Sequence, residues 1–224
     1  MKNFLRPLKL ACLAAASMLI VSCGGSADYR SILPADSFMT VSVNPASLMW
    51  KCEAGDLDQH PLYVRIKAEL DKDQNLSAEE KEYLLALLKN PGESGIDVES
   101  PFYVFSSSSF PYPTVVGKVN NEDKLHASLD VMAKEQICQP VGEADGYSFT
   151  TMNSGLLVFN SSTILVVNVS GTTQTDKAKE SITNLLKQTA SNSIVKSGAF
   201  QKMEKQKSDI NFFASCLLYT SDAA

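Results

Sequence analysis

The sequence predicts an α+β fold, in which helices pack on one face of a mostly antiparallel sheet. Two observations lead to this class. Three strand-like stretches between residues 147 and 169 are joined by connections of hairpin length, which makes neighbouring strands antiparallel. Elsewhere the strand-like stretches are separated by longer segments whose apolar residues recur at helical spacing.

Seven stretches have the alternation, or the run of β-branched and aromatic residues, that is typical of strands. They lie at residues 38–43, 102–105, 114–119, 147–152, 156–159, 164–169 and 209–214. In the first, apolar residues alternate with Thr40 and Ser42, which predicts a half-buried strand. Asparagine, serine and glycine fill the connections at 153–155 and 160–162, as they do in tight hairpins.

Six stretches carry apolar residues three or four positions apart, which is the spacing of one helix face. They lie at residues 46–51, 62–70, 79–88, 122–134, 175–188 and 200–207. The third is preceded by a capping box, because Ser77 is followed three residues later by Glu80. Residues 90–92, Asn-Pro-Gly, end this helix, since proline and glycine break helical periodicity.

The first 22 residues have the three parts of a secretory signal. A basic segment with Lys2, Arg6 and Lys9 precedes an apolar stretch at 10–21, and no acidic residue occurs before Asp28. A helix over that apolar stretch rises about 18 Å, well short of a hydrocarbon core of about 30 Å. We therefore expect residues 1–22 to be a signal peptide that is removed, and not a transmembrane anchor.

The cleavage region at 20–23, Ile-Val-Ser-Cys, resembles a lipobox, in which a small residue precedes an obligatory cysteine. We expect cleavage between Ser22 and Cys23, and acylation of Cys23 on its thiol and on its new amine. Three acyl chains make release from a membrane negligible. Residues 23–30 would then form a lipidated flexible tether, since they begin with small and polar residues. No aspartate follows Cys23, so we expect an outer-membrane protein, with the face left open.

The other end of the chain has an unusual composition. Its residues 216–224 match, at every position, the translation of a transposase-based sequencing adapter. The natural domain is therefore expected over residues 31–215, with a non-native tail after it. The strand at 209–214 would lack any neighbour that later residues supply, so we expect a fold that is incomplete at this edge.

The mature chain is acidic, and this excludes one class of partner. All 25 Asp and Glu residues follow the signal, whereas three of the 20 Lys and Arg residues lie within it. An acidic domain repels phosphate backbones, so no nucleic acid is expected as a partner. Cys52 and Cys138 can form a disulfide in an oxidising compartment, or Cys138 can be a free buried thiol.

No short motif in the sequence strongly supports a catalytic or metal-binding site. Residues 71–82 begin like a calcium-binding EF-hand, but Leu76 occupies the position that needs glycine. Residues 92–95 resemble a nucleophile elbow, but the second glycine is one residue early and a strand follows. His60 and His126 are the only histidines, and His126, on the predicted helix beside Leu125, has no second ligand at helical spacing. We therefore expect no catalytic residue, metal or cofactor in this part of the protein.

The loop at 106–113 is the remaining candidate for a binding site. Phe110 and Tyr112 alternate with prolines, which stiffen the loop. Two exposed rings on such a loop can bind a glycan or a partner protein. Rings that pack inward only hold the loop in place, and both interpretations are open.

Dispersed features of the chain resemble the Bacteroidetes lipoproteins of domain-of-unknown-function family 4836. They are ILPAD at 32–36, NP at 90–91, GID at 95–97, VNNEDKL at 119–125, EADGY at 143–147, SGAF at 197–200 and DINFF at 209–213. The resemblance implies an exported lipoprotein whose family continues past residue 215. It implies no established activity, and it supplies no catalytic residues.

Two functions are consistent with the sequence. A lipid-anchored envelope protein with a non-enzymatic binding or structural role is favoured, because the chain shows no nucleophile–base pair and no metal cluster. Its partners would be the membrane, through the lipid, and an unidentified protein or glycan. The alternative is an envelope hydrolase whose active site lies in a C-terminal part that this sequence does not contain.

Overall fold

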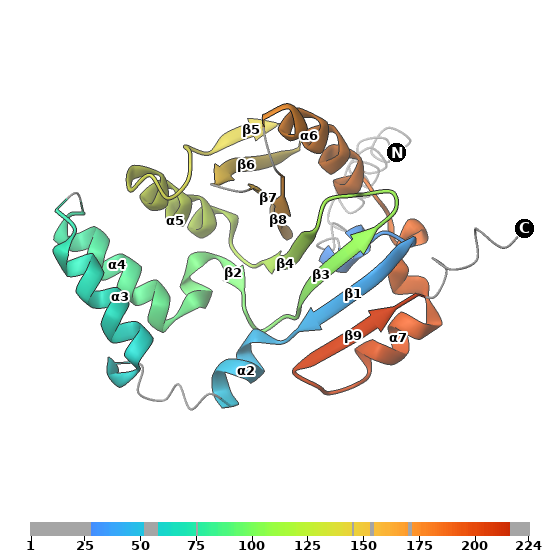
Figure 1. Cartoon of the computed structure of the whole chain (residues 1–224), viewed down its shortest axis with the longest axis horizontal. Coiled ribbons are helices and arrows are strands. Elements are labelled where there is room, and N and C mark those ends of the chain that lie inside the picture. The colour runs from blue at the N-terminus through green and yellow to red at the C-terminus, as the bar shows by residue number, and fades with distance from the viewer. Residues whose placement is uncertain are drawn as a thin grey trace, which may run out of the picture.

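The structure is a computed structural model of the whole chain, and it describes residues 28–51, 58–74, 76–144, 146–152, 155–169 and 172–215 (Figure 1). The predicted cleavage and acylation sites at Ser22 and Cys23, together with Cys52 and the tail at 216–224, lie outside the described residues. Within the described ranges, no helix combines the length and hydropathy needed to cross a membrane.

The strands of the described chain form one sheet, in which every pairing is antiparallel. They are β1 (Ser37–Val43), β2 (Ile96–Asp97), β3 (Phe102–Ser107), β4 (Thr114–Val119), β5 (Gly142–Ala144), β6 (Tyr147–Met152), β7 (Gly155–Phe159), β8 (Thr163–Asn168) and β9 (Ile210–Ala214). Their order across the sheet is β5-β6-β7-β8-β4-β3-β1-β9, and β2 pairs with β4 beside this path. The predicted α+β class and antiparallel sheet are confirmed. The short strands β2 and β5 are additions to the predicted set.

The predicted helices are all present; the helix at 122–134 has the predicted bounds, and the ends of the others are moved by a few residues. They are α2 (Pro45–Lys51), α3 (Pro61–Lys72), α4 (Ala78–Lys89), α5 (Glu122–Lys134), α6 (Thr172–Leu186) and α7 (Gly198–Glu204). Short 3-10 helices in the described chain include η1 (Tyr29–Ile32), η3 (Pro91–Ser94), η4 (Ala190–Asn192) and η5 (Ile194–Lys196). At the start of α4 the predicted capping box forms, because the Glu80 N–H donates to Ser77 Oγ (3.1 Å) and the Ser77 N–H donates to Glu80 Oε2 (3.0 Å).

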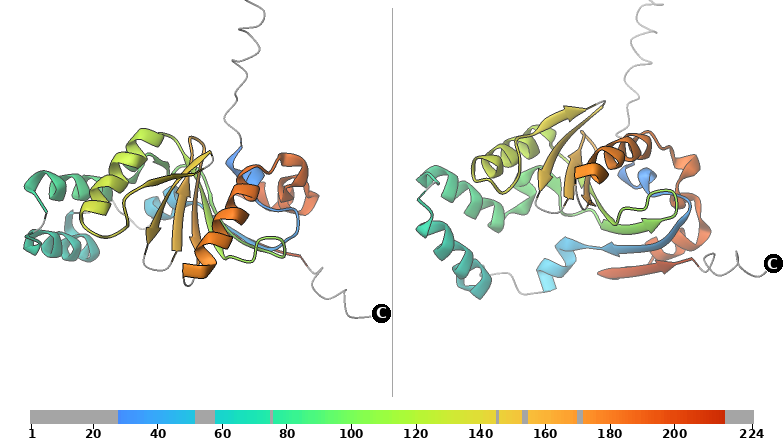
Figure 2. Two further views of the ribbon diagram at one scale, coloured as in Figure 1. Left: turned by 90° about the horizontal axis from the view of Figure 1, so that it is seen from above. Right: turned by 45° about the horizontal axis from the view of Figure 1, so that its top comes forward.

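The sheet carries helices on both faces, as Figure 2 shows for α5 and α6. On the first face, Leu156 and Val158 of β7 belong to the larger core, which α6, α7 and η1 complete. On the second face, Leu157 and Phe159 of the same strand belong to a smaller core with Leu125 of α5. Neighbouring strand residues point to opposite faces, so the two cores lie on opposite sides of the sheet. The expectation of helices on one face therefore holds for α6 and α7, whereas α5 covers part of the other.

Strand β1 turns its polar side inward. Thr40 and Ser42 are buried on the first face, while Met39, Val41 and Val43 are half-buried on the second. The alternation in the sequence predicts that one side of this strand is covered, and it does not say which. Helix α7, which precedes β9, packs on the first face with Phe200 and Met203 in the larger core, so the side of β1 that carries Thr40 and Ser42 is the covered one.

The hairpin of α3 and α4 lies apart from the sheet (Figure 1). Its link to the rest of the fold includes a hydrogen bond between the Tyr83 hydroxyl and Ser128 Oγ of α5 (2.8 Å). No described residue of α4 is fully buried. The helical period of this segment therefore predicted the helix correctly, although its apolar face is only partly covered.

Candidate functional site

The aromatic loop at 106–113 does not present Phe110 to solvent. Phe110 is only 3% exposed, and its ring lies 6.0 Å from that of Phe105 and 5.3 Å from that of Tyr112. Its backbone N–H donates to Ser107 Oγ (3.0 Å), and Tyr112 is half-buried. Phe110 therefore packs inward and holds the loop in place, which is the second of the two interpretations of this loop. The pair of exposed rings that a binding loop requires is not formed.

The other short motifs have structural roles in the described chain. The Ser94 hydroxyl donates to the Pro91 carbonyl (2.6 Å), and Gly95 follows in the left-handed conformation with φ 88°. The 92–95 motif is therefore a turn, as its position before a strand indicates. Cys138 is a free buried thiol whose Sγ contacts the Leu129 carbonyl (3.7 Å). His126 lies half-buried on α5, with Nδ1 3.3 Å from Asp130 Oδ2. Among the described residues no group of three or more His, Cys, Asp or Glu side chains could hold a metal ion.

A row of apolar side chains crosses the open part of the second face. The strand register places its members side by side: Val166 of β8, Val115 of β4, Val104 of β3, Val41 of β1 and Phe212 of β9. We call these five residues the open strip. Phe212 is 63% exposed and Val166 is 41% exposed, while the three valines between them are half-buried. Ile210 of β9, 57% exposed, extends the apolar surface beside Val43.

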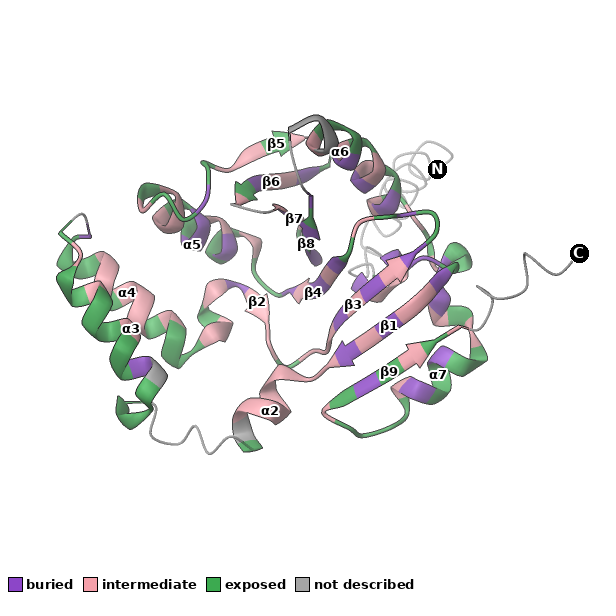
Figure 3. Cartoon of the chain, in the orientation of Figure 1, coloured by how far each residue is buried: buried purple, intermediate pink, exposed green. Residues whose placement is uncertain are grey.

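Among the described residues, no strand pairs with the outer edge of β9, and this free edge lies beside the open strip. The Asn44 N–H donates to the Asp209 carbonyl (2.8 Å), and the Ser215 N–H donates to the Phe38 carbonyl (2.8 Å). Backbone hydrogen bonds alternate along an antiparallel pair, so these two bonds fix which residues of β9 face β1. The residues whose N–H and C=O groups point away from β1 are Ile210, Phe212 and Ala214. In Figure 3, β9 lies at the rim of the sheet and carries exposed residues.

A basic segment leads into this edge. Lys202, Lys205 and Lys207 are exposed, and none of them is in an ion pair within the described ranges. The strand that follows, from Ile210 to Ala214, carries no charge. Soluble proteins commonly protect an edge strand with lysine, proline or a bulge within the strand. The lysines of this segment lie before β9 and not within it, so the backbone of the strand is not protected against pairing with another strand.

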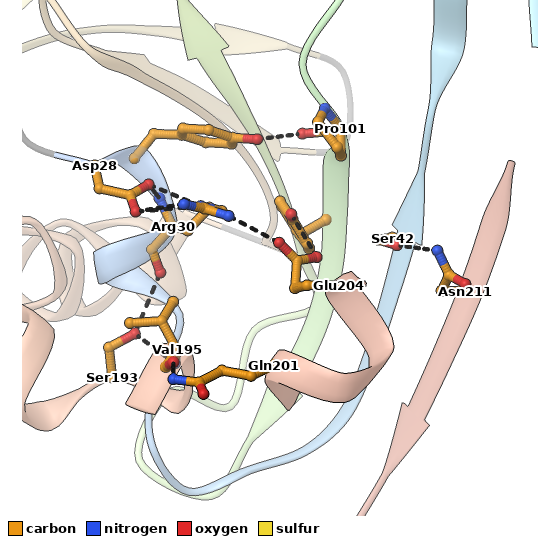
Figure 4. A network of polar contacts seen from close by, with 11 residues as sticks. Asp28, Arg30, Ser42, Pro101, Ser193, Val195, Gln201, Glu204 and Asn211 are labelled. Atoms are coloured by element: carbon orange, nitrogen blue, oxygen red, sulfur yellow. Dashed lines mark hydrogen bonds and ion pairs between the residues drawn. The ribbon is translucent and has the colours of Figure 1, made fainter. Parts of the chain in front are cut away.

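A polar cluster holds α7 on the first face of the sheet (Figure 4). Glu204 of α7 accepts hydrogen bonds from the Tyr103 hydroxyl (2.8 Å) and from Arg30 Nη1 (2.8 Å). Arg30 also forms an ion pair with Asp28 (2.8 Å), and the Tyr29 hydroxyl donates to the Pro101 carbonyl (2.8 Å). Burial, assisted by the nearby Tyr29 and Glu204, raises the pKa of Tyr103 far above its ordinary value. Tyr103 therefore remains a proton donor to Glu204 at physiological pH.

Sequence reasoning predicted that the strand at 209–214 would lack a neighbour, but it did not find the open strip or this cluster. The strip joins five strands, and Arg30 and Glu204 are 174 positions apart. One signal was present in the sequence. The strand at 209–214 has large apolar residues on both of its sides, and a strand at the rim of a sheet with one covered face leaves such residues exposed.

Comparison with known proteins gives a family match and a distantly similar solved structure. None of the curated proteins matches it. A solved structure titled "Structure of crystal form I of TP0453" is similar at 7% sequence identity and a TM-score of 0.39. The alignment covers 74% of this chain and 53% of that one, so this chain spans about half the length of that protein.

The family comparison covers most of the chain. The model described as "Domain of unknown function (DUF4836)" matches residues 29–221, which includes all of the described sheet. The match also includes part of the segment 216–224, whose interpretation as adapter-derived stays a prediction. The chain belongs to the DUF4836 family, a domain of unknown function.

Proposed function

We propose that this protein is a lipid-anchored, non-enzymatic binding module of the outer membrane, whose sheet accepts an extended segment of a partner protein at β9. The alternative occupant of this edge is a segment of the same protein that follows residue 215, since the sequence leads us to expect that later residues supply neighbours of this strand. The observation that carries the proposal is the coincidence of the open strip with the free edge of β9. An added strand receives its affinity from backbone hydrogen bonds and its specificity from alternate side chains. Ile210 and Phe212 supply both kinds of contact, because their N–H and C=O groups point away from β1 and their side chains are exposed.

The chemistry of the partner segment follows from this surface. A strand that pairs with β9 places every second side chain beside Ile210 and Phe212, so those positions are apolar. Covering the exposed parts of these two side chains contributes roughly 2–4 kcal/mol in total, given that full burial of one such side chain is worth about 1.5–3 kcal/mol. The lysines at the entrance of β9 favour acidic residues at the matching end of the partner. The partner is therefore an extended, alternating segment with an acidic terminus.

Peptide binding to the purified protein tests the proposal. One synthetic peptide alternates valine with threonine and ends in two glutamates, and a second replaces those glutamates with lysines. We expect the acidic peptide to bind and the basic one to bind more weakly, as measured by calorimetry. Phe212→Lys should weaken binding by about tenfold or more, which corresponds to about 1.4 kcal/mol. Val64→Lys is the matched control, because Val64 is an exposed apolar residue on α3, away from the sheet.

Three results would contradict the proposal. Binding that is equal for the two peptides would remove the charge argument. Binding that survives Phe212→Lys would place the peptide elsewhere. If the protein is a dimer without peptide, and Phe212→Lys makes it a monomer, the edge serves self-association and the assignment to a partner segment is overturned.

The lipid anchor is tested separately. Cells that express the full chain and receive labelled palmitate should label the wild-type protein and not Cys23→Ser. Membrane fractionation should recover the labelled protein with the outer membrane. Label that persists in Cys23→Ser, or recovery in the inner membrane, would contradict the corresponding part of the proposal.

A further inference from the structure

The two rims of the sheet differ in their protection against pairing. The rim at β5 has only three residues, Gly142–Ala144, with Pro140 before it and the exposed charge of Glu143 within it. Short length, proline and charge are features by which proteins protect an edge strand. The rim at β9 has five residues, Ile210–Ala214, and none of them is charged. An acidic segment is therefore expected at β9, and Glu143 disfavours it at β5.

The backbone of β9 favours one direction for an added strand. Ile210, Phe212 and Ala214 each direct one N–H and one C=O away from β1. In an antiparallel pair, each of them exchanges both hydrogen bonds with the one residue directly opposite. In a parallel pair the bonds are slanted, and the pairing is slightly less stable per residue. Every pairing in the described sheet is antiparallel, and an antiparallel segment continues that pattern beyond β9.

The segment that leads into β9 is positively charged in balance. Its charged side chains and those paired with them are positive at Arg30, Lys51, Lys202, Lys205 and Lys207, and negative at Asp28, Glu204 and Asp209. The ion pairs join Arg30 to both Asp28 and Glu204, and Lys51 to Asp209. A positive excess remains even though Arg30 is shared in this way, and it comes from the exposed lysines. Two of these, Lys205 and Lys207, lie within five residues of the start of β9.

The direction of the added strand decides which of its ends lies near these lysines. An antiparallel segment passes Ala214 first and Ile210 last, so the residues that follow its paired stretch lie beside the connection that contains Lys207. A parallel segment would bring the residues before its paired stretch to the same place. Carboxylates are favoured there, because opposite charges attract across an interface.

We infer that the partner segment runs antiparallel to β9, with its acidic residues directly after its alternating apolar stretch. The inference rests on the proposed function, because it gives the direction and the residue order of the segment that β9 accepts. The partner side chain opposite Phe212 is apolar, since it extends the open strip by one strand. The acidic residues follow the residue that pairs with Ile210, which places them toward the lysines.

Two peptides of identical composition test the residue order on the purified protein. The forward peptide is Val-Thr-Val-Thr-Val-Glu-Glu, and the reversed peptide is Glu-Glu-Val-Thr-Val-Thr-Val. Both are acetylated and amidated, so their termini carry no charge. The alternating stretch reads the same in both directions, and only the position of the glutamates differs. We expect the forward peptide to bind at least about threefold more tightly in calorimetry, given the modest contribution of exposed ion pairs.

A nitroxide label at the N-terminus of the forward peptide measures the direction of pairing. In antiparallel pairing the label lies beside the end of β9, so it should broaden the amide NMR signal of Ala214 more than that of Ile210. These two residues are about 13 Å apart along the strand, because each residue advances the strand by about 3.3 Å. A label at the C-terminus should give the opposite order.

Charge variants give an independent readout. Replacing both lysines, Lys205→Gln with Lys207→Gln, should lower the affinity of the forward peptide to that of the reversed one. Lys67→Gln is the matched control and should leave the preference unchanged, because Lys67 is an exposed lysine on α3, away from the sheet. Phe212→Lys should weaken the binding of both peptides, because both use the same edge.

The outcomes separate this inference from the proposed function. Broadening that is strongest at Ile210 with the N-terminal label shows parallel pairing, which overturns the inference and leaves β9 as the accepting strand. Equal binding of the two peptides, or a preference that survives the double lysine variant, overturns the position assigned to the acidic residues. A bound peptide that broadens no amide of β9, or no binding of either peptide, overturns the inference and the proposed function together.

Discussion

Replacing Glu204 with alanine tests how α7 is held on the sheet. The carboxylate of Glu204 accepts from the hydroxyl of Tyr103, whose side chain is fully buried, and from the guanidinium of Arg30. The Glu204 side chain is itself only 21% exposed. Water therefore has limited access to the Tyr103 hydroxyl and the Arg30 guanidinium, which lose this acceptor when Glu204 is replaced. Glu204→Ala therefore leaves a buried donor without an acceptor.

The expected loss of stability can be estimated from these contacts. A hydrogen bond to a charged group contributes about 1.5–3 kcal/mol to stability, and leaving the buried Tyr103 hydroxyl without an acceptor costs a similar amount. These are two descriptions of the same loss, so they are counted once. The part-exposed ion pair with Arg30 adds at most about 1 kcal/mol, since Arg30 keeps its contact with Asp28. The free energy of unfolding should fall by about 3 kcal/mol. For a domain of this size, each kcal/mol corresponds to a shift of about 2–4 °C in Tm.

Urea denaturation of the purified protein, followed by circular dichroism, measures this change. Glu82→Ala on α4 is the control, because Glu82 is exposed, and its loss should be within about 0.5 kcal/mol. Glu204→Gln should lose less than Glu204→Ala, since its amide oxygen can still accept from Tyr103. If Glu204→Ala is no more destabilising than the control, the cluster does not hold α7 and this reasoning is refuted.

Three further predictions concern other parts of the fold. Ser77→Ala removes the capping box of α4 and should cost about 1 kcal/mol in urea denaturation. Gly95→Ala should lower Tm clearly, because an added Cβ would lie 2.2 Å from the Asn121 carbonyl oxygen at a φ of 88°. Burial raises the pKa of Asp97, but hydrogen bonds and charge from Lys118 outweigh it and hold that pKa below its ordinary value. This contribution to stability is therefore present at neutral pH and is lost as the pH falls through the lowered pKa. An NMR titration should show the Asp97 pKa rise in Lys118→Met.

Local structure could be predicted closely wherever the chain carries its own signals. The strands at 114–119 and 147–152 and the helix at 122–134 end at the expected residues. For the helix the reason is visible at its start, where Asn121 Oδ1 accepts from the Lys124 N–H (2.9 Å) as an N-cap. Such signals lie within a few residues of each other, so they can be recognised without the tertiary structure.

The surfaces could not be predicted, because they depend on what covers each element. The alternation in β1 is clear in the sequence, yet Thr40 and Ser42 face the core while Val41 faces outward. Phe110 looks like an exposed loop residue until Phe105, on the preceding strand, is placed beside it. The pairings of distant residues decide these outcomes, and a single sequence does not contain them.

Amide hydrogen exchange along β9 tests the central claim most directly. In the free protein, the N–H groups of Ile210, Phe212 and Ala214 should exchange rapidly, while those of Asn211 and Phe213, which face β1, should be protected. Addition of the acidic alternating peptide should slow exchange at Ile210, Phe212 and Ala214 and leave the other two unchanged. Uniform exchange along β9, or no added protection at those three amides in the presence of bound peptide, would contradict the assignment of this edge as a strand-accepting site.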